Sequence, residues 1–360
     1  MSLADEELMR LVAKMTQLAH KASPAALEAA AAQLSGLPVA PLVPSFVHKV
    51  GCASLDLLRD RHELLSWGSM DITEDDCGVI AHLLLSGSLP ELKRLFLFQN
   101  PIGDAGLVTL MGGLARSKVQ LATLALSSTG ITDGGVAPLV SALSSGTLAQ
   151  LRSLRLSSNK IGDAGVAAIA RAAVGSAPAL REVLLNGNEV GDKGVAAIAA
   201  AAVEGAFGSL NILGLMENQV GDEGLSAVAG SLSAGSFPLL EELWLWSNRI
   251  GDAGMRALGA PITAGQLPNC KVLAFAANRI GDAGLASLAD AAGAGTLPRC
   301  QRLYLSENES IGDAGLAALT AALSRGCLDA TTHMYLAGNS GGADAKAAAC
   351  AAFRGTTIDV

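Results

Sequence analysis

The chain is poor in aromatic residues, in charge and in basic residues. Aromatics account for 3% of the 360 residues and charged residues for 16%, and the formal net charge is −8. A protein that holds a phosphate backbone as its main ligand needs a basic surface. We therefore expect no nucleic-acid partner, although this charge balance leaves room for a local basic patch.

Signatures of catalysis and of cofactor binding are also missing. No phosphate-binding P-loop pattern occurs, the six cysteines lack the spacing of metal ligands, and the five histidines are dispersed along the chain. The sequence therefore predicts a protein that is not an enzyme and that needs no metal and no cofactor.

No stretch is long and apolar enough for a membrane helix. The longest apolar runs, such as residues 195–203, are much shorter than the roughly 20 residues that cross a bilayer. The N-terminus carries Asp5, Glu6 and Glu7, which is the wrong charge for a secretory signal. We expect a cytoplasmic protein without membrane insertion.

What the chain does contain is a repeat. The segment at residues 159–165, Asn-Lys-Ile-Gly-Asp-Ala-Gly, recurs in related form at intervals of 29 to 31 residues. Its asparagine position falls at 100, 129, 159, 188, 218, 248, 278, 308 and 339. Self-similarity at this period is typical of a solenoid, in which each unit packs only on its neighbours and the stack builds a long surface.

Each repeat predicts a short strand followed by a helix. Leu151, Leu154 and Leu156 form the pattern LxxLxLxxN with Asn159. Leu154 and Leu156 share the parity that places two side chains on one face of a strand. Residues 164–174 are rich in helix formers and carry apolar residues at helical spacing. Glycine and proline then end the helix before the next strand.

This pattern resembles the leucine-rich repeat of the ribonuclease-inhibitor type. The Ile-Gly-Asp-Ala-Gly segment is similar to repeats in innate-immune receptors of the nucleotide-oligomerisation type. The resemblance extends over roughly residues 60–350, or about ten units. It implies an α/β solenoid of horseshoe shape, with a parallel sheet on the concave face and helices on the convex face. It is specific for the fold and says little about function.

Two columns of polar residues accompany the turns. The asparagine column is expected to satisfy backbone groups where each strand bends into a loop, because an amide both donates and accepts. Thr129 interrupts the column, so we expect a weaker rung there. The aspartate column, from Asp104 to Asp313, is expected to cap the helices. A row of cation sites is the alternative, but one carboxylate per repeat supplies too few oxygen ligands for calcium.

Glycine and cysteine occupy further repeated positions. The glycine before each aspartate is expected to form a tight turn with positive φ, although Thr132 stands there in one repeat. Cys270 and Cys300 replace a core leucine in consecutive repeats and should lie one strand apart. We expect both to be small buried thiols in a reducing compartment, and a disulfide between them stays open as an alternative.

The strand positions between the core leucines carry most of the large polar aromatics. Two of the three tryptophans and both tyrosines fall there. Trp, Tyr and Arg dominate interaction hot spots, so we predict a partner-binding site on this face and a smaller second site at Phe96 and Phe98. The predicted members of the main site are Met216, Trp244, Trp246, Arg302, Tyr304 and Tyr335. The alternative is that these rings pack on one another and only shield the sheet.

The ends of a solenoid need caps, because a stack of repeats exposes apolar core at each end. Residues 1–50 are expected to form an N-terminal helical cap, and residues 51–360 the solenoid of about ten units with a C-terminal cap. An imperfect repeat with Met70 in the asparagine position is expected within residues 45–90. A last helix is expected from Asp344 to Phe353. Residues 356–360 then either add an edge strand or remain a free peptide of the kind that PDZ domains accept.

These observations predict a non-enzymatic scaffold that binds a protein or peptide on its concave face. Two other interpretations are kept. The chain could be a structural subunit of a large assembly, or a GTPase-activating protein of the Ran type, which uses similar repeats. The latter family adds an acidic C-terminal tail, whereas residues 353–360 are not an acidic run.

Overall fold

The computed structural model describes residues 45–46, 48–50, 63–293 and 295–360. The chain falls into two compact units, one up to Lys160 and the other from Ile161 onward. Most of the predicted N-terminal cap lies outside the described residues, so the boundary at residue 50 stays a prediction. No helix among the described residues is long and apolar enough to cross a membrane.

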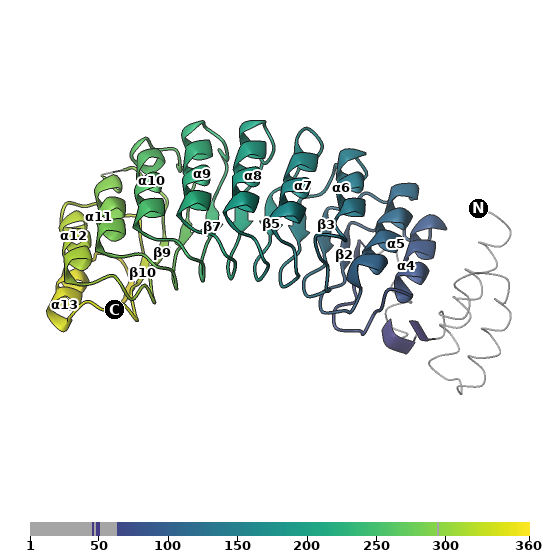
Figure 1. Ribbon diagram of the computed structural model, residues 1–360, viewed down its shortest axis with the longest axis horizontal. Helices are drawn as coiled ribbons and strands as arrows, with labels where there is room; N and C mark the ends of the chain where they lie inside the picture. The colour runs from purple at the N-terminus through teal and green to yellow at the C-terminus, as the bar shows by residue number, and fades with distance from the viewer. Residues whose placement is uncertain (1–44, 47, 51–62, 294) are drawn as a thin grey trace. The chain divides into compact units, whose positions relative to one another are not determined.

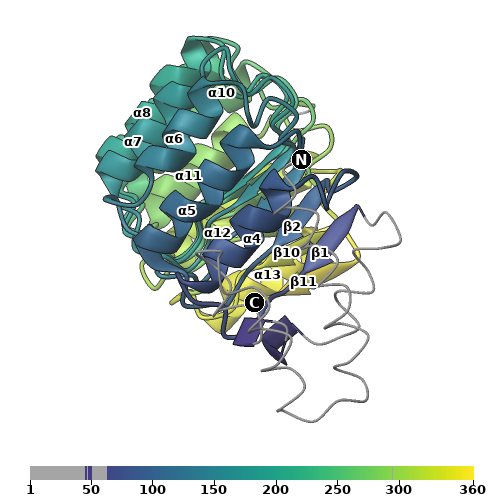
Figure 2. The same ribbon diagram turned by 90° about the vertical axis from the view of Figure 1, so that its right-hand side faces the viewer.

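The first unit alternates parallel strands with helices (Figures 1 and 2). Its strands follow chain order and pair in register: β1 (Leu64–Ser66), β2 (Arg94–Phe96), β3 (Thr123–Ala125) and β4 (Ser153–Arg155). Its helices are α4 (Asp76–Leu85), α5 (Gly103–Arg116) and α6 (Ala137–Ser144).

The second unit continues the same alternation over more repeats. Its parallel strands are β5 (Glu182–Leu184), β6 (Ile212–Gly214), β7 (Glu242–Trp244), β8 (Val272–Ala274), β9 (Arg302–Tyr304), β10 (His333–Tyr335) and β11 (Thr357–Asp359). Its helices are α7 (Asp163–Ala173), α8 (Asp192–Val203), α9 (Asp222–Ser233), α10 (Asp252–Thr263), α11 (Asp282–Ala291), α12 (Asp313–Ser324) and α13 (Ala343–Ala352). The helices lie side by side along one face and the strands form the other (Figure 1). This is the predicted leucine-rich-repeat solenoid.

Columns of leucine form the core between the two layers. Leu213, Leu243 and Leu273 stand opposite one another in register, and each is at most 1% exposed. Leu225 and Met255, near the starts of α9 and α10, are buried against the same core. Burial of apolar surface stabilises a protein by roughly 25 cal/mol per Å², so these columns are the main stabilising term of the stack.

Asn248 shows how the asparagine column works. Its Nδ2 donates to the carbonyl of Leu215 in the preceding repeat at 2.8 Å and to that of Leu245 in its own at 3.1 Å. Its Oδ1 accepts from the backbone N–H of Val220 at 2.9 Å. One side chain therefore satisfies backbone groups of two repeats that would otherwise be buried without partners. The predicted role of the column is confirmed.

The rung at Thr129 is built differently. Its hydroxyl donates to the carbonyl of Leu126 at 2.7 Å, but a threonine has no amide to serve the preceding repeat. The N–H of Ile102, whose counterparts in other repeats donate to the next asparagine, donates to the carbonyl of Asn100 at 2.9 Å. Gly103 adopts a φ of +61° beside this turn. That this rung is weaker stays a prediction.

The aspartates cap helices, but not their own. Asp222 is the first residue of α9, and its Oδ1 accepts from the N–H groups of Gly251 at 2.7 Å and Gly254 at 2.9 Å. Both amides belong to the start of α10 in the following repeat. Each carboxylate therefore stabilises the positive end of the next helix and links two repeats. The predicted capping is confirmed, and the structure adds that the capped helix belongs to the following repeat.

The expected positive φ of the glycine before each aspartate is wrong for the second unit. Gly191, Gly221 and Gly251 have φ between −106° and −115°. Glycine relieves a tight contact there, because a Cβ on Gly221 would lie 3.2 Å from Oδ2 of Asp192. Thr132 is accommodated at this position because its hydroxyl donates to Oδ2 of Asp104 at 2.7 Å.

Both described ends show the expected irregular repeats. At the start, Phe46 and Trp67 meet edge to face with ring centroids 5.3 Å apart, and both side chains are buried. At the other end, α13 matches the predicted last helix within one residue. Strand β11 pairs with β10, so the terminal residues add an edge strand and are not a free peptide.

Candidate protein-binding site

Strand register on the second unit brings the predicted aromatic residues together. Trp244 on β7 stands between Gly214 on β6 and Ala274 on β8, on the face opposite the leucine core. Trp246 follows two residues later, and 44% of its surface is exposed. Both flanking residues are small, but the side chains of Leu184 and Asn186 approach Gly214 closely, so the open side of the Trp244 indole is the one over Ala274.

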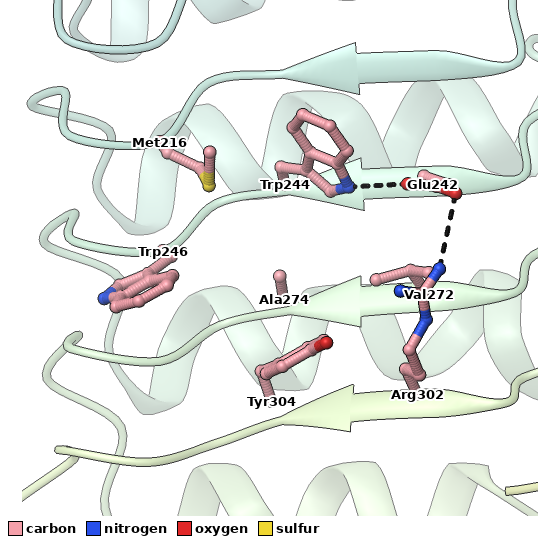
Figure 3. Close-up of a pocket in the computed structure, with 8 residues that line it drawn as sticks. All are labelled: Met216, Glu242, Trp244, Trp246, Val272, Ala274, Arg302 and Tyr304. Atoms are coloured by element: carbon pink, nitrogen blue, oxygen red, sulfur yellow. Dashed lines mark hydrogen bonds and ion pairs between the residues drawn. The ribbon is translucent and has the colours of Figure 1, made fainter. Parts of the chain in front are cut away.

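A hollow of about 220 Å³ lies over Ala274 (Figure 3). Its lining residues are Met216, Glu242, Trp244, Trp246, Val272, Ala274, Arg302 and Tyr304. Ala274 is 5% exposed and sits between the rings of Trp244, Trp246 and Tyr304, so it forms the floor while they form walls. The hollow is mainly apolar, with charged groups at one end.

Glu242 organises the polar end of the hollow. One carboxylate oxygen accepts from Nε1 of Trp244 at 2.9 Å, and the other lies 3.6 Å from the guanidinium of Arg302. The first contact fixes the orientation of the indole, since Trp has a single donor. The second places a cation of which 45% is exposed at the rim, where it can meet a polar group of a ligand.

Tyr335 supports the site without lining the hollow. Its ring stacks on that of Tyr304, with centroids 4.5 Å apart and planes within 3° of parallel. Such ring pairs add roughly 0.5–1.5 kcal/mol beyond the area that they bury. Tyr304 is therefore held in place as a wall of the hollow.

The structure thus groups Met216, Trp244, Trp246, Arg302 and Tyr304 around one hollow. It does not place Phe96 and Phe98 there, because both belong to the first unit. The Phe98 ring covers Gly68, where an added Cβ would lie 2.3 Å from the ring.

Val272 was missed at the sequence level. It precedes the floor residue by two positions on β8, so it points to the same face, and it is 3% exposed. In the sequence Val272 lies between Lys271 and Leu273 and gave no sign of a surface role, whereas the tryptophans did. The signal that could have found it is the same alternation that identified Trp244.

Cys270 and Cys300 lie on consecutive rungs, two residues before a pair of strand residues that are in register. Both are buried free thiols. Burial raises the pKa of Cys300 to about 12 and also raises that of Cys270. Such thiols behave as small apolar groups, as expected. Among the described residues no cluster of His, Cys, Asp or Glu could hold a metal ion.

Comparisons with known proteins agree with this architecture. A family model described as Leucine Rich repeat matches residues 149–170, 178–199, 209–229, 238–259 and 301–319. The ribonuclease inhibitor of Sus scrofa is 40% identical over 79 residues, which are 22% of this chain and 17% of the inhibitor. That of Mus musculus is 38% identical over 79 residues, with the same shares. The chain therefore spans less than a fifth of these relatives.

Solved structures show weaker likenesses. An internalin from Listeria monocytogenes is 19% identical with a TM-score of 0.48, covering 78% of this chain and 70% of that one. An internalin C2 from the same species is 23% identical with a TM-score of 0.40, covering 64% and 76%. These scores carry no further conclusion. The repeated LxxLxLxxN pattern, the alternating parallel strands and helices, and the family-model match show leucine-rich repeats, and the similarity to the ribonuclease inhibitors supports the ribonuclease-inhibitor type.

Proposed function

We propose that this protein binds a protein or peptide partner through the hollow over Ala274, on the sheet face of the second unit. Proteins built from leucine-rich repeats typically mediate protein–protein interaction. The observation that carries the proposal is the exposed Trp246 beside a hollow walled by two further aromatic rings. Exposed large aromatics around a concavity are characteristic of contact hot spots.

The size of the hollow favours a side chain of a partner over a free small molecule. Its volume of about 220 Å³ is below the roughly 300–1,000 Å³ of sites for small ligands. An apolar side chain placed on Ala274 would be covered by three rings, while the Glu242–Arg302 pair would meet polar groups beside it. The rings lose little conformational freedom on binding, because each has only two side-chain torsions.

The proposal concerns a non-enzymatic interaction. The residues at the hollow offer aromatic contact and one ion pair, and no nucleophile is paired with a base in this set. A scaffold role and a cytoplasmic location both stay predictions from the sequence. The assembly-subunit and GTPase-activating interpretations also stay predictions, since no described residue favours either.

The test compares three single variants in quantitative capture from cell extract, followed by affinity measurement with the protein identified. Trp246→Ala removes a wall, and Ala274→Leu fills the floor. Leu239→Ala is the matched control, because Leu239 is 46% exposed and lies outside the hollow. Truncation of a central hot-spot aromatic should weaken the binding free energy by about 2 kcal/mol, which corresponds to a roughly thirtyfold lower affinity.

Both site variants should therefore lose the partner while Leu239→Ala keeps it. Circular dichroism and thermal unfolding establish that all three variants remain folded. If Trp246→Ala and Ala274→Leu capture the same proteins as the unaltered chain, the hollow is not the binding site.

A further inference from the structure

A second hollow, of about 470 Å³, lies on the first unit where its strands begin. It is lined by Glu63, Lys93, Arg94, Gln120, Ala122, Gln150 and Arg152. Lys93 and Arg94 lie at the start of β2, and Arg152 lies just before β4. Strand pairing places the Lys93 and Arg152 positions two rungs apart, on either side of Ala122.

This basic hollow has a net positive charge, whereas the whole chain is negatively charged. It has three cations and one carboxylate in a protein with a net charge of −8. Glu63 accepts from Nζ of Lys93, and this hydrogen bond with the charges of Lys93 and Arg94 lowers the pKa of the Glu63 carboxyl. Among the residues that the structure describes, neither Arg94 nor Arg152 forms an ion pair.

The same strand edge of the second unit is arranged differently. There Lys271 pairs with Glu241 at 2.7 Å, and Arg302 lies 3.6 Å from Glu242. Lys271 thus has a carboxylate one rung away, and Arg302 has one two rungs away. Within the described chain no carboxylate lies at ion-pair distance from Arg94 or Arg152, so the donors of these two guanidinium groups are available to an anionic ligand.

We propose that the basic hollow binds an acidic peptide segment of a partner protein, with carboxylates of the peptide on Arg94 and Arg152. Guanidinium groups present paired donors that match a carboxylate, and the amides of Gln120 and Gln150 can both donate to and accept from a peptide backbone. This site lies on the other unit from the hollow over Ala274 and does not depend on the function proposed for it.

Peptide carboxylates fit better than nucleic acid. The lining contains no aromatic ring on which a base could stack, and a strongly negative protein repels a long polyanion. Two strand spacings are about 10 Å, close to three residues of an extended polyproline-type peptide. Acidic residues three apart in such a peptide would therefore reach both arginines.

The experiment uses the full chain and a fluorescein-labelled peptide, Glu-Pro-Pro-Glu-Pro-Pro-Glu, with binding followed by fluorescence anisotropy. The neutral control peptide has glutamine in place of each glutamate. The test variant combines Arg94→Glu with Arg152→Glu. The control variant combines Arg256→Glu with Arg279→Glu, which changes the net charge equally at two exposed arginines outside the hollow.

The acidic peptide should bind the unaltered chain and the control variant alike, and about tenfold or more weakly to the test variant. The glutamine peptide should bind the unaltered chain more weakly than the acidic peptide does, by a similar factor. Added salt should weaken binding of the acidic peptide. Equal binding of both peptides, or equal loss in both double variants, overturns the proposal. So does tighter, Arg152-dependent binding of oligothymidylate or of inorganic phosphate than of the peptide. Unfolding curves of both variants confirm that each is folded.

Discussion

The hydrogen bonds at the turn between strand and helix are the same along the second unit and vary along the first. In α8 to α12 each helix follows an extended glycine whose amide is held by an aspartate of the preceding repeat. In the first unit, Thr73 and Thr132 donate through both the amide and the hydroxyl, to Asp76 in the same repeat and to Asp104 in the preceding one. The carboxylate is therefore the constant element, while its partner can be a bare amide or an amide with a hydroxyl.

The exposed strand positions of the two units also differ. The second unit carries an aromatic hollow whose cation is paired, and the first unit carries a basic hollow in which Arg94 and Arg152 are unpaired within the described chain. The same backbone thus presents two kinds of chemistry. Outward side chains can vary freely because the core leucines between them keep the strands in register.

The largest expected difference between the units lies in their tryptophans. Trp67 of the first unit is 1% exposed and packs on Phe46, whereas Trp246 of the second is 44% exposed. Trp67→Ala should lower the free energy of unfolding by about 3–5 kcal/mol, since it leaves a cavity. Trp246→Ala should change it by less than about 1 kcal/mol. Urea unfolding followed by circular dichroism measures both, and similar losses would contradict the assigned burial.

The asparagine column provides a second test. Asn248→Thr gives the second unit the residue that the first unit has at Thr129. The N–H of Val220 and the carbonyl of Leu215 would lose a partner, so the free energy of unfolding should fall by about 2–3 kcal/mol.

The reverse change, Thr129→Asn, should have a small effect, because Ile102 already has another acceptor. Hydrogen exchange of the Val220 amide tests whether the stability lost in Asn248→Thr comes from this hydrogen bond. Unchanged protection of that amide would show that the column does not act as a shared backbone partner.

A third test uses two glycines of α9, at which substitution by alanine should change stability in opposite directions. A Cβ at Gly224 would lie 2.7 Å from Oδ1 of Asp192, whereas one at Gly230 meets nothing within 4 Å. Gly224→Ala should destabilise by about 2 kcal/mol through overpacking. Gly230→Ala should stabilise by about 0.5–1 kcal/mol, because alanine is the better helix former.

Gly135 is the equivalent position of the first unit, and there a Cβ would lie only 2.0 Å from Oδ1 of Asp104. Gly135→Ala should therefore destabilise at least as much as Gly224→Ala. Thermal unfolding ranks the three variants by stability. If Gly224→Ala stabilises the protein, the close contact between Asp192 and this glycine position is contradicted.

The smallest effect concerns buried thiols, one in each unit. Burial, with smaller effects of Asp76 and Glu74, raises the pKa of Cys77 to about 12, and burial raises that of Cys300 to the same value from 9.0. The unfolded chain loses these protons first, so the stability that they contribute is complete below pH 9 and declines as pH rises toward 12.

Cys300→Ala removes this dependence at one site. The stability of the unaltered chain relative to this variant should fall by about 1.4 kcal/mol between pH 8 and pH 10. Paired urea titrations at the two pH values measure it, and Cys77→Ala gives the same comparison in the first unit. A constant difference would mean that the thiol is not shielded as the structure shows.

Sequence reasoning predicted the local elements because one repeat encodes them completely. Leu154 and Leu156 fixed which strand face is buried, and the residues after Asn159 indicated the helix. The same alternation predicts that Trp244 and Tyr304 lie on the outer face. The contacts of Asp222 could not be assigned in this way, because its partners Gly251 and Gly254 lie in the next repeat and depend on how two helices pack.

The sequence by itself determined the repeat, the strand–helix alternation and the inner and outer faces, because all of these follow from spacing within about 30 residues. Only the tertiary structure decided which side chains from separate repeats share a hollow. Ala274 becomes a floor, and Lys93 and Arg152 come to flank Ala122, through the lateral pairing of strands. Strand pairing brings together residues that are far apart in the chain, and their separation in sequence does not reveal which of them will meet.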